Sequence, residues 1–400
     1  MSRAHLLLCF MNYGPYHRAR LQACDPGVAG LQLAAAQSEY TWETSADERL
    51  VTVHAGPLEE VPPARWDALV SAALDRLDPA VCAVAGYGIP GMRAILSWCL
   101  RHRRPIVLMS DSRAEDEPRR AWREWIKGRI VRSCAAGFVA GRPHLAYLES
   151  LGMDRQKIFT GYDVVDNGHF SRGADAARAA SAATRKQYGL PENYFLACAR
   201  FIPEKNLPRL LEAYAAYYRA AVGAGKEHEP WKLVLVGDGP LATKVRQSIS
   251  RLGLEDAVIL PGYVPFDVLP RYYGLAQALI HPSVRDTWGL VVNEAMAAGL
   301  PVLVSTDCGC AGDLVEPGVN GFTFDPENAG QLAGLMEKMT SLPAEERAAM
   351  GAAGRRIIAG WDLACFAENL RAAADQALET GAPASSLVTR LLLRLLARRA

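Results

Sequence analysis

The stretch Ser283-Val-Arg-Asp-Thr-Trp-Gly-Leu-Val-Val-Asn-Glu-Ala-Met-Ala-Ala-Gly299 combines a turn, the start of a helix and two carboxylates. Asp286 and Glu294 stand eight positions apart on either side of Gly289, and the apolar strand Pro301–Ser305 follows. A turn of this kind directs backbone N–H groups and the dipole of the helix at one place, which suits a phosphate. A carboxylate on either side suits the hydroxyls of a ribose and of a sugar. The stretch therefore predicts a nucleotide-sugar site in an α/β protein.

Length and composition limit the class of protein. At 400 residues the chain is long enough for two domains, and its net charge of +1 gives no reason to expect nucleic acid as a partner. Its nine cysteines include one close pair, Cys308-Gly-Cys310, which has neither zinc nor redox CxxC spacing. We therefore expect buried thiols, no metal and a reducing cytoplasm. The short apolar run Leu6–Met11 fits a first strand better than a secretory signal, and no run is long enough to span a bilayer.

Strands and helices alternate along the whole chain, which predicts parallel sheets with helices on both faces. In the first half we expect strands at His5–Phe10, Leu50–His54, Val81–Ala85, Pro105–Met109 and Gly137–Val139, helices at Pro90–Arg103 and Arg119–Ser133, and a last short strand at Gly161–Asn167. In the second half we expect strands at Tyr194–Ala199, Lys232–Val236, Val258–Leu260 and Ala278–His281 and helices at Asn206–Ala221, Leu241–Leu252 and Phe266–Leu275.

These elements divide into two Rossmann-like lobes, residues 1–170 and 186–360, which would face each other across a cleft. The segment Ser171–Ala183, rich in Ala, Arg and Gly, reads as part of a linker at 171–185. Trp361–Leu378 predicts a helix, within 361–380, that crosses back to the first lobe, and residues 381–400 form a tail.

Other segments of the second lobe add candidate ligand contacts. Arg200 and Lys205 follow a strand and open a helix, where two cations can neutralise a diphosphate, although a solvated loop is an alternative. Gly237 ends another strand, either for close approach of a ligand or for an ordinary tight turn. Tyr263 and Val264 lie in an apolar turn that can offer groups to a flat base.

Four motifs occur in the order found in family 4 retaining glycosyltransferases of the two-Rossmann-lobe (GT-B) fold, which the second lobe resembles throughout. They are Arg200…Lys205, Gly237-Asp-Gly-Pro240, Leu260-Pro-Gly262 and Asp286…Glu294-Ala-Met-Ala-Ala-Gly299. The resemblance implies that Arg200 and Lys205 hold the donor diphosphate, Glu294 the ribose and Asp286 the transferred hexose. It places the backbone around Gly289, Leu290 and Val291 against donor phosphate or sugar, and Tyr263 and Val264 against the base.

The sequence departs from the family pattern at two places. Asp286 stands where the family has Glu, which keeps the charge but shortens the side chain by one methylene. After the fourth strand of the first lobe, Ser110 and Asp111 stand where many members have a His near the reacting carbon. Either residue is a candidate substitute for that His, and a residue elsewhere in the chain is the alternative. Ser110–Ser112 also fit a simple cap of the next segment.

The first lobe should hold the acceptor. Gly14, His17 and Arg18 follow the first strand, where a loop lining a cleft is expected, and a turn with Pro15 opening a helix is the alternative. Trp122 and Trp125 lie in a basic helix whose arginines suit lipid phosphate, although an apolar stripe of this spacing is more often core.

The tail predicts contact with a membrane surface. Within Leu387–Ala400, Arg390, Arg394 and Arg398 form a basic stripe at helical spacing among leucines. A basic amphipathic helix can lie on an anionic membrane, and a helix docked on the protein is the alternative.

Taken with the resemblance, these features predict a retaining, metal-independent hexosyltransferase without a cofactor. The donor is a nucleoside diphosphate sugar, with UDP favoured and GDP possible. The acceptor is a glycan or lipid-linked glycan of surface polysaccharide assembly, handled at the inner face of the membrane. Alternatives are a soluble small-molecule acceptor and a catalytically degenerate partner subunit that binds nucleotide sugars. A sugar phosphorylase would need a pyridoxal-binding lysine, and the sequence has no motif for one. The continuous match around Glu294 argues against a nucleotide-sugar epimerase.

Overall fold

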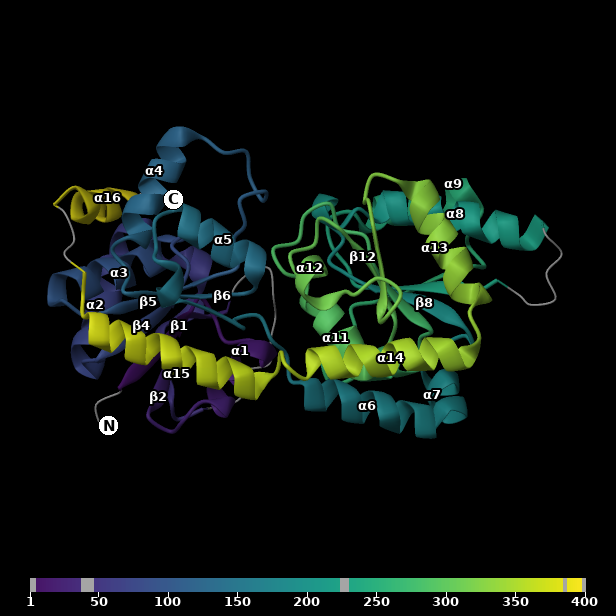
Figure 1. Cartoon of the computed structure of the whole chain (residues 1–400), viewed down its shortest axis with the longest axis horizontal. Helices are drawn as coiled ribbons and strands as arrows, with labels where there is room; N and C mark the ends of the chain where they lie inside the picture. Colours follow the sequence, from purple (N-terminus) through teal and green to yellow (C-terminus); the bar gives the residue numbers. More distant parts are fainter. Residues whose placement is uncertain (1–4, 37–46, 224–229, 384–386, 398–400) are drawn as a thin grey trace. The chain divides into compact units, whose positions relative to one another are not determined.

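The computed structural model describes residues 5–36, 47–223, 230–383 and 387–397, and these form two compact units. The first unit comprises Met1–Val164 and Leu363–Ala400, and the second comprises Val165–Asp362. Each unit is built on one parallel β-sheet with helices packed against it (Figure 1). The predicted pair of Rossmann-like lobes is confirmed.

The sheet of the first unit has seven strands in the order β3-β2-β1-β4-β5-β6-β7. Every residue of the central strand β1 is buried, as expected for a parallel sheet covered on both faces. The strands are β1 (Leu6–Phe10), β2 (Val28–Ala36), β3 (Leu50–Pro57), β4 (Val81–Ala85), β5 (Ile106–Ser110), β6 (Ala136–Val139) and β7 (Ile158–Thr160). The helices are α1 (Pro15–Ala23), α2 (Trp66–Leu77), α3 (Pro90–His102), α4 (Ala121–Val131), α5 (Arg142–Ser150), α15 (Leu363–Thr380) and α16 (Leu387–Ala397), with short 3-10 turns at Leu58–Glu60, Pro63–Arg65 and Arg155–Lys157.

The sheet of the second unit has six strands in the order β10-β9-β8-β11-β12-β13. The strands are β8 (Tyr194–Cys198), β9 (Lys232–Val236), β10 (Val258–Gly262), β11 (Ala278–His281), β12 (Val302–Ser305) and β13 (Gly321–Phe324). The helices are α6 (Asn167–Ala179), α7 (Ser181–Tyr188), α8 (Leu207–Gly223), α9 (Ala242–Leu252), α10 (Leu269–Leu275), α11 (Leu290–Ala298), α12 (Ala311–Leu314), α13 (Ala329–Ser341) and α14 (Ala344–Ile358), with a 3-10 turn, η4, at Pro203–Lys205.

Three sequence-based expectations differ from the structure. Ser171–Ala183 is no linker, because it lies in α6 and α7, and the boundary between the units falls at Val164. The last strand of the first unit is β7, at Ile158–Thr160, and Gly161–Asp166 carries no strand. Strand β2 was not predicted because its alanine-rich end favours a helix by propensity, and pairing with both β1 and β3 overrides that preference.

The last two helices both belong to the first unit. Helix α15 packs against α1 and the β6–β7 edge of the sheet, and α16 packs against α3 and α4 (Figure 1). Leu393 of α16 is fully buried in the core of that unit. The tail helix is therefore docked through one face, while Leu391 and Leu395 stay exposed at 60% and 53%. Arg398 and the side chains of Arg390 and Arg394 lie outside the described part of the structure.

A buried arginine fixes the first helix of the first unit. The Arg20 side chain donates from Nη2 to the carbonyl oxygen of Val164 at 2.9 Å and forms an ion pair with Asp163 at 3.3 Å. Its guanidinium also lies 5.2 Å from the ring centre of Tyr162. Helix α1, and the loop that precedes it, are thereby tied to the end of the first unit.

Candidate active site

The candidate donor residues of the second unit gather at one edge of its sheet. Arg200 and Lys205 follow β8, Gly237 follows β9, Tyr263 and Val264 follow β10, and Asp286 follows β11. These four strands are neighbours, in the order β10-β9-β8-β11, so the chain order reverses between β8 and β11. Ligands of open α/β sheets bind beside the carboxyl ends of strands at such a reversal.

An ion pair joins the two sides of that reversal. Lys205 donates from Nζ to Oδ2 of Asp286 at 2.6 Å, and the two side chains are 19% and 15% exposed. The adjacent pair Arg285–Glu204 spans the same two segments at 2.6 Å, and the backbone N–H of Val284 donates to the carbonyl oxygen of Glu204 at 3.0 Å. The η4 turn is therefore held against the segment that leads to α11.

His281, the last residue of β11, contacts the Asp286 carboxylate. Its Nε2 lies 2.8 Å from Oδ2 of Asp286, and the residue is 1% exposed. Burial by itself lowers the pKa of His281, but the negative charge of Cys308 and the hydrogen bond with Asp286 raise it to about 9. Burial opposes ionisation of Asp286, yet His281 and Lys205 hold its pKa well below the ordinary value. Asp286 is thus a carboxylate held between two cations.

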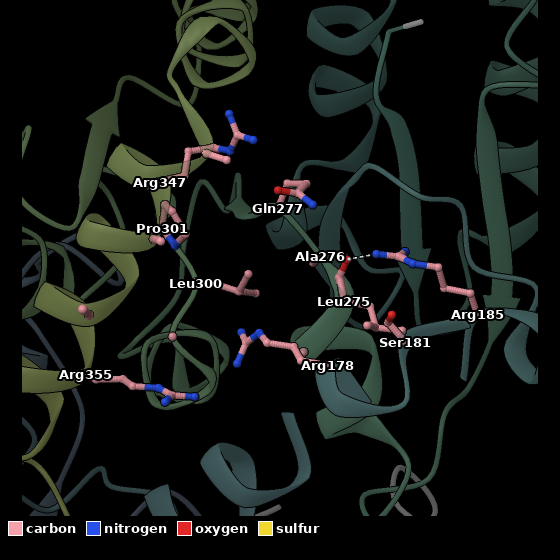
Figure 2. A pocket seen from close by; sticks show the side chains of 15 residues that line it. Arg178, Ser181, Arg185, Leu275, Ala276, Gln277, Leu300, Pro301, Arg347 and Arg355 are labelled. Carbon is pink, nitrogen blue, oxygen red and sulfur yellow. Dashed lines mark hydrogen bonds between the residues drawn. The ribbon is translucent and has the colours of Figure 1, made fainter. Parts of the chain in front are cut away.

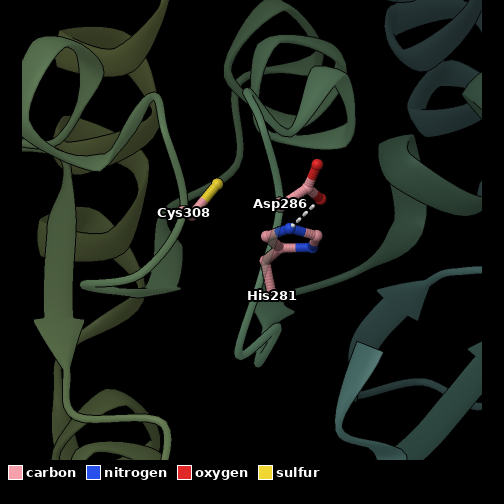
Figure 3. Close-up of side chains that lie close together, drawn as sticks. All are labelled: His281, Asp286 and Cys308. Carbon is pink, nitrogen blue, oxygen red and sulfur yellow. Dashed lines mark hydrogen bonds and ion pairs between the residues drawn. The ribbon is translucent and has the colours of Figure 1, made fainter. Parts of the chain in front are cut away.

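Cys308 completes this cluster (Figure 3). Ligand atoms of His281, Asp286 and Cys308 lie within 4.8 Å of one another, and Cys308 Sγ is 3.5 Å from Cys310 Sγ. Burial raises the pKa of Cys308, but hydrogen bonds with Cys310 and His281 lower it to about 6. These are zinc-type ligands, but the Lys205 ammonium already contacts the carboxylate that a cation would need.

The start of α11 presents a phosphate-binding geometry. Gly289 caps the helix with φ 100°, and a Cβ there would lie 2.5 Å from Cys308 Sγ, so only glycine fits. The first N–H groups of a helix, here from Leu290 and Val291, have no partner within the helix and point beyond its N-terminus. The positive end of the helix dipole lies at the same place.

Glu294 lies one turn further along α11 and is 1% exposed. Tyr273 donates its hydroxyl to Oε2 of Glu294 at 2.6 Å. Burial, with the nearby Cys198 and Glu294, raises the pKa of Tyr273 well above its ordinary value, so the hydroxyl stays a donor. Glu294 is therefore oriented within the unit rather than free to turn.

The loops that follow β9 and β10 contain the other candidate donor contacts. Gly237 has φ 130°, and a Cβ there would lie 1.8 Å from the carbonyl oxygen of Ala199, so the end of β9 requires glycine to pass the β8 loop. Tyr263 is 62% exposed, whereas Val264 is buried. The Tyr263 ring is therefore available to a flat partner.

In the first unit, the predicted acceptor residues follow β1. Gly14 is the N-terminal cap of α1, and Arg18 donates from Nε to the carbonyl oxygen of Tyr13 at 3.1 Å. The His17 ring packs 4.1 Å from Phe10, and burial, with the charge of Arg20, lowers its pKa to about 3. His17 is therefore a neutral imidazole at pH 7.

Asp111 lies apart from these three residues within the same sheet. It follows Ser110, the last residue of β5, and β4 separates β5 from β1. The backbone N–H of Ser112 donates to Oγ of Ser110 at 3.3 Å within a loop, and the next helix, α4, begins only at Ala121, so Ser110 does not cap a helix. Sequence reasoning missed His281 and Cys308, although a polar residue ending the apolar run Ala278–His281 was a visible signal.

Comparison with known proteins gives a family match within the second unit. Residues 181–357 match the family model of glycosyl transferases group 1. Alpha-D-kanosaminyltransferase of Streptomyces kanamyceticus is 29% identical over 265 residues, which cover 65% of this chain and 58% of that protein. Alpha-monoglucosyldiacylglycerol synthase of Streptococcus pneumoniae is 32% identical over 112 residues, 28% of this chain and 24% of that protein. The matches thus span less than two thirds of these relatives.

Solved structures cover both units. HepE of Anabaena in complex with UDP has a TM-score of 0.70 at 16% identity, over 92% of this chain and 99% of that one. Sucrose-phosphate synthase of Thermosynechococcus elongatus has a TM-score of 0.71 at 17% identity, over 94% and 99%. The fold is that of GT-B glycosyltransferases, and residues 181–357 are similar to glycosyl transferases group 1.

Acidification should remove the stabilising effect of Asp286. Because the folded pKa of this carboxyl is lowered, its ion pairs contribute fully above its ordinary pKa of about 3.9 and are lost as pH falls below it. At pH 7, Asp286→Asn should lower the free energy of unfolding by about 3 kcal/mol. That difference should shrink between pH 5 and pH 3 in urea titrations, a window set by the ordinary carboxyl pKa.

Glu327→Gln is the matched control, because Glu327 is an exposed carboxylate of the same unit that pairs with Arg209. It should change stability by less than about 1 kcal/mol at either pH. Equal losses for the two variants at pH 7 would show that Asp286 is not held by its neighbours.

Proposed function

We propose that this protein is a group 1 glycosyltransferase that moves a hexose from a nucleoside diphosphate sugar to its acceptor with retention at the anomeric carbon. The observation that carries the proposal is the contact of Lys205 with Asp286 at the strand-order reversal, beside the N-terminus of α11. Cations and helix N–H groups suit the diphosphate, and the carboxylate suits sugar hydroxyls. A UDP-sugar is favoured, because HepE of Anabaena, which shares the fold, has structures with UDP and with UDP-glucose.

Charge stabilisation of the leaving diphosphate is the main catalytic effect in this proposal. Arg200 and Lys205 contact the diphosphate, and protonated His281 offsets the negative charge of Cys308 beside Asp286. Donors fixed before the reaction stabilise charge that develops in the transition state. Asp286 then accepts hydrogen bonds from hydroxyls of the hexose, while Lys205 bridges its carboxylate and the phosphate.

The rest of the donor is recognised by groups of the same sheet edge. Glu294, already oriented by Tyr273, accepts the ribose hydroxyls, and Gly237 allows close approach of the donor. The exposed ring of Tyr263 stacks on the base, with Val264 beside it. We propose no cofactor and no metal, because a cation at Asp286 would meet the Lys205 ammonium.

The first unit supplies the acceptor side. Gly14, neutral His17 and Arg18 hold the acceptor after β1, and Asp111 or Ser110 takes the place of the family's His. The acceptor we favour is a lipid-linked glycan of surface polysaccharide assembly at the inner face of the membrane. Alpha-monoglucosyldiacylglycerol synthase, a relative, is named for a lipid product, whereas alpha-D-kanosaminyltransferase of Streptomyces kanamyceticus is the precedent for the small-molecule alternative.

Exposed apolar side chains support an attachment to a membrane surface. In the described residues no helix is long and apolar enough to cross a bilayer. Trp122 and Trp125 of α4 are 58% and 48% exposed, and Arg123 and Arg129 lie over their rings. Helix α16, which packs against α4, exposes Leu391 and Leu395. Aromatic rings beside arginines suit the interface of an anionic membrane.

Nucleotides should stabilise the folded protein through Glu294. In a thermal-shift panel of UDP, GDP, ADP and their sugar conjugates, a ligand at ~100 times its dissociation constant stabilises by ~2.7 kcal/mol. Glu294→Ala should abolish this ligand-induced shift, whatever it does to the melting temperature without ligand. Glu327→Ala, an exposed carboxylate of the same unit, should keep it. No shift with any nucleotide would favour the degenerate partner subunit.

The transferred sugar should keep its anomeric configuration. Proton NMR of the first product formed from an α-linked donor should show an α-glycoside, and EDTA should leave the rate unchanged. Lys205→Gln should lower kcat by about 10²-fold or more, because it removes a donor to the leaving group. Lys244→Gln, on the exposed face of α9, should not. A β-glycoside, or full loss of the rate with EDTA, would contradict the mechanism.

Membrane attachment should depend on the exposed face of α16. Leu391→Ser/Leu395→Ser should reduce binding to vesicles rich in anionic lipid by about tenfold or more, since each exposed leucine buries apolar surface on docking. Val319→Ser, at an exposed apolar site of the second unit, is the control. The double substitution is a more specific test than deletion of Leu387–Ala400, because the deletion also removes the buried Leu393. Unchanged vesicle binding would leave the soluble-acceptor alternative.

A further inference from the structure

Four arginines of the second unit surround a cavity of about 430 Å³ that the proposed reaction does not use (Figure 2). Arg178 comes from α6, Arg185 from α7, and Arg347 and Arg355 from α14. The floor between them is apolar and includes Leu300 and Pro301. Cavities of this volume hold small molecules in other proteins.

Positive charge in this cavity is only partly balanced. Asp175, on α6, accepts from Arg178 at 2.9 Å and from Arg355 at 2.7 Å. Arg185 donates to the backbone carbonyl oxygens of Leu275 and Pro191. Arg347 donates to the carbonyl oxygen of Leu342. Among the described residues that line the cavity, none is acidic. Two of the four cations therefore share one carboxylate, and the other two have only carbonyl oxygens as acceptors in the described part of the chain.

Arg178 and Arg355 also repel each other. Burial and then the charge of Arg355 lower the pKa of Arg178, and burial lowers that of Arg347. The guanidinium Nε atoms of Arg347 and Arg355 are buried and have no hydrogen-bond partner. A bound anion would offset this repulsion and accept from several guanidinium groups at once.

The cavity is separate from the candidate donor site. Its walls include Gly274–Gln277, just before β11, and Gly299–Pro301, just before β12. It therefore lies at the amino ends of these strands, whereas Asp286 follows the carboxyl end of β11. The two sites occupy opposite edges of one parallel sheet.

We propose that this cavity binds a small phosphorylated molecule, with its phosphate oxygens on the guanidinium groups and its uncharged part over Leu300 and Pro301. Planar guanidinium groups match phosphate oxygens in pairs, and several of them around one cavity favour a phosphate over a single carboxylate. Ser181 and Gln277, which also line the cavity, can bond hydroxyls of the uncharged part. The ligand is distinct from the sugar donor.

The test removes the candidate donor contacts first. Isothermal titration calorimetry of Arg200→Gln/Lys205→Gln protein with inorganic diphosphate should still show binding. Adding Arg178→Gln and Arg347→Gln should weaken that binding about tenfold or more, the loss expected for charge-assisted hydrogen bonds. Adding Arg356→Gln instead, an exposed neighbour on α14, should leave it unchanged. Circular dichroism and urea midpoints check that each variant folds.

Two results would overturn the proposal. They are an absence of diphosphate binding in the Arg200→Gln/Lys205→Gln protein, and equal binding with and without the cavity substitutions. If the combined variant does not fold, Arg347→Gln alone takes its place, with Arg347→Lys expected to retain part of the affinity. Glucose 1-phosphate binding more tightly than inorganic phosphate would support the proposed organic ligand. Equal binding would contradict the proposed contact of an uncharged part with Leu300 and Pro301, and would leave the inorganic ion as the occupant. These results do not depend on glycosyl transfer, so failure of either proposal is distinguishable.

Discussion

The ion pair between Lys205 and Asp286 is the interaction on which the geometry of the donor edge depends. It joins two loops that are 81 residues apart in sequence and that follow neighbouring strands, β8 and β11. The ion pair of Arg285 with Glu204 and the backbone hydrogen bond from Val284 to Glu204 join the same two loops beside it. His281 holds the carboxylate from the strand below. Changing any of these three residues should therefore disturb the other two, and energies measured for them will not add.

Both units use the same strand order around their first strand. The order β3-β2-β1-β4 in the first unit repeats as β10-β9-β8-β11 in the second. In each unit the strand order therefore reverses beside the first strand. The loop that follows this strand contains Gly14 in the first unit and Arg200 in the second. One unit carries a neutral His17 and a buried Arg20 there, whereas the other concentrates cations and a carboxylate. The same backbone plan thus supports two different kinds of contact.

The sequence predicted the parts of the fold that depend on local pattern. Strand Lys232–Val236 and strand Ala278–His281 were placed at their observed bounds, because apolar runs end there at turn residues. The prediction of a linker at Ser171–Ala183 was wrong, because alanine, arginine and glycine suit a linker as well as a helix. The helix there, α6, is stabilised by packing against α10 and α11. In the site, convergence of Lys205 and Asp286 followed from strand order. The contact of His281 with Asp286, five residues away, was not predicted, because no helical or strand periodicity marks it. The contact of Arg355 with Asp175 was not predicted because the two residues are 180 positions apart.

The placement of α15 and α16 has a consequence for biosynthesis. These helices are made after the second unit, yet they pack on a unit whose other residues end at Val164, before the second unit begins. During translation at about 5–20 residues per second, the first sheet must wait about 10–40 s with the sites for α15 and Leu393 uncovered. The second unit, in contrast, is continuous in sequence and is complete as soon as it leaves the ribosome. Chaperone dependence should therefore fall mainly on the part of the chain that is synthesised first.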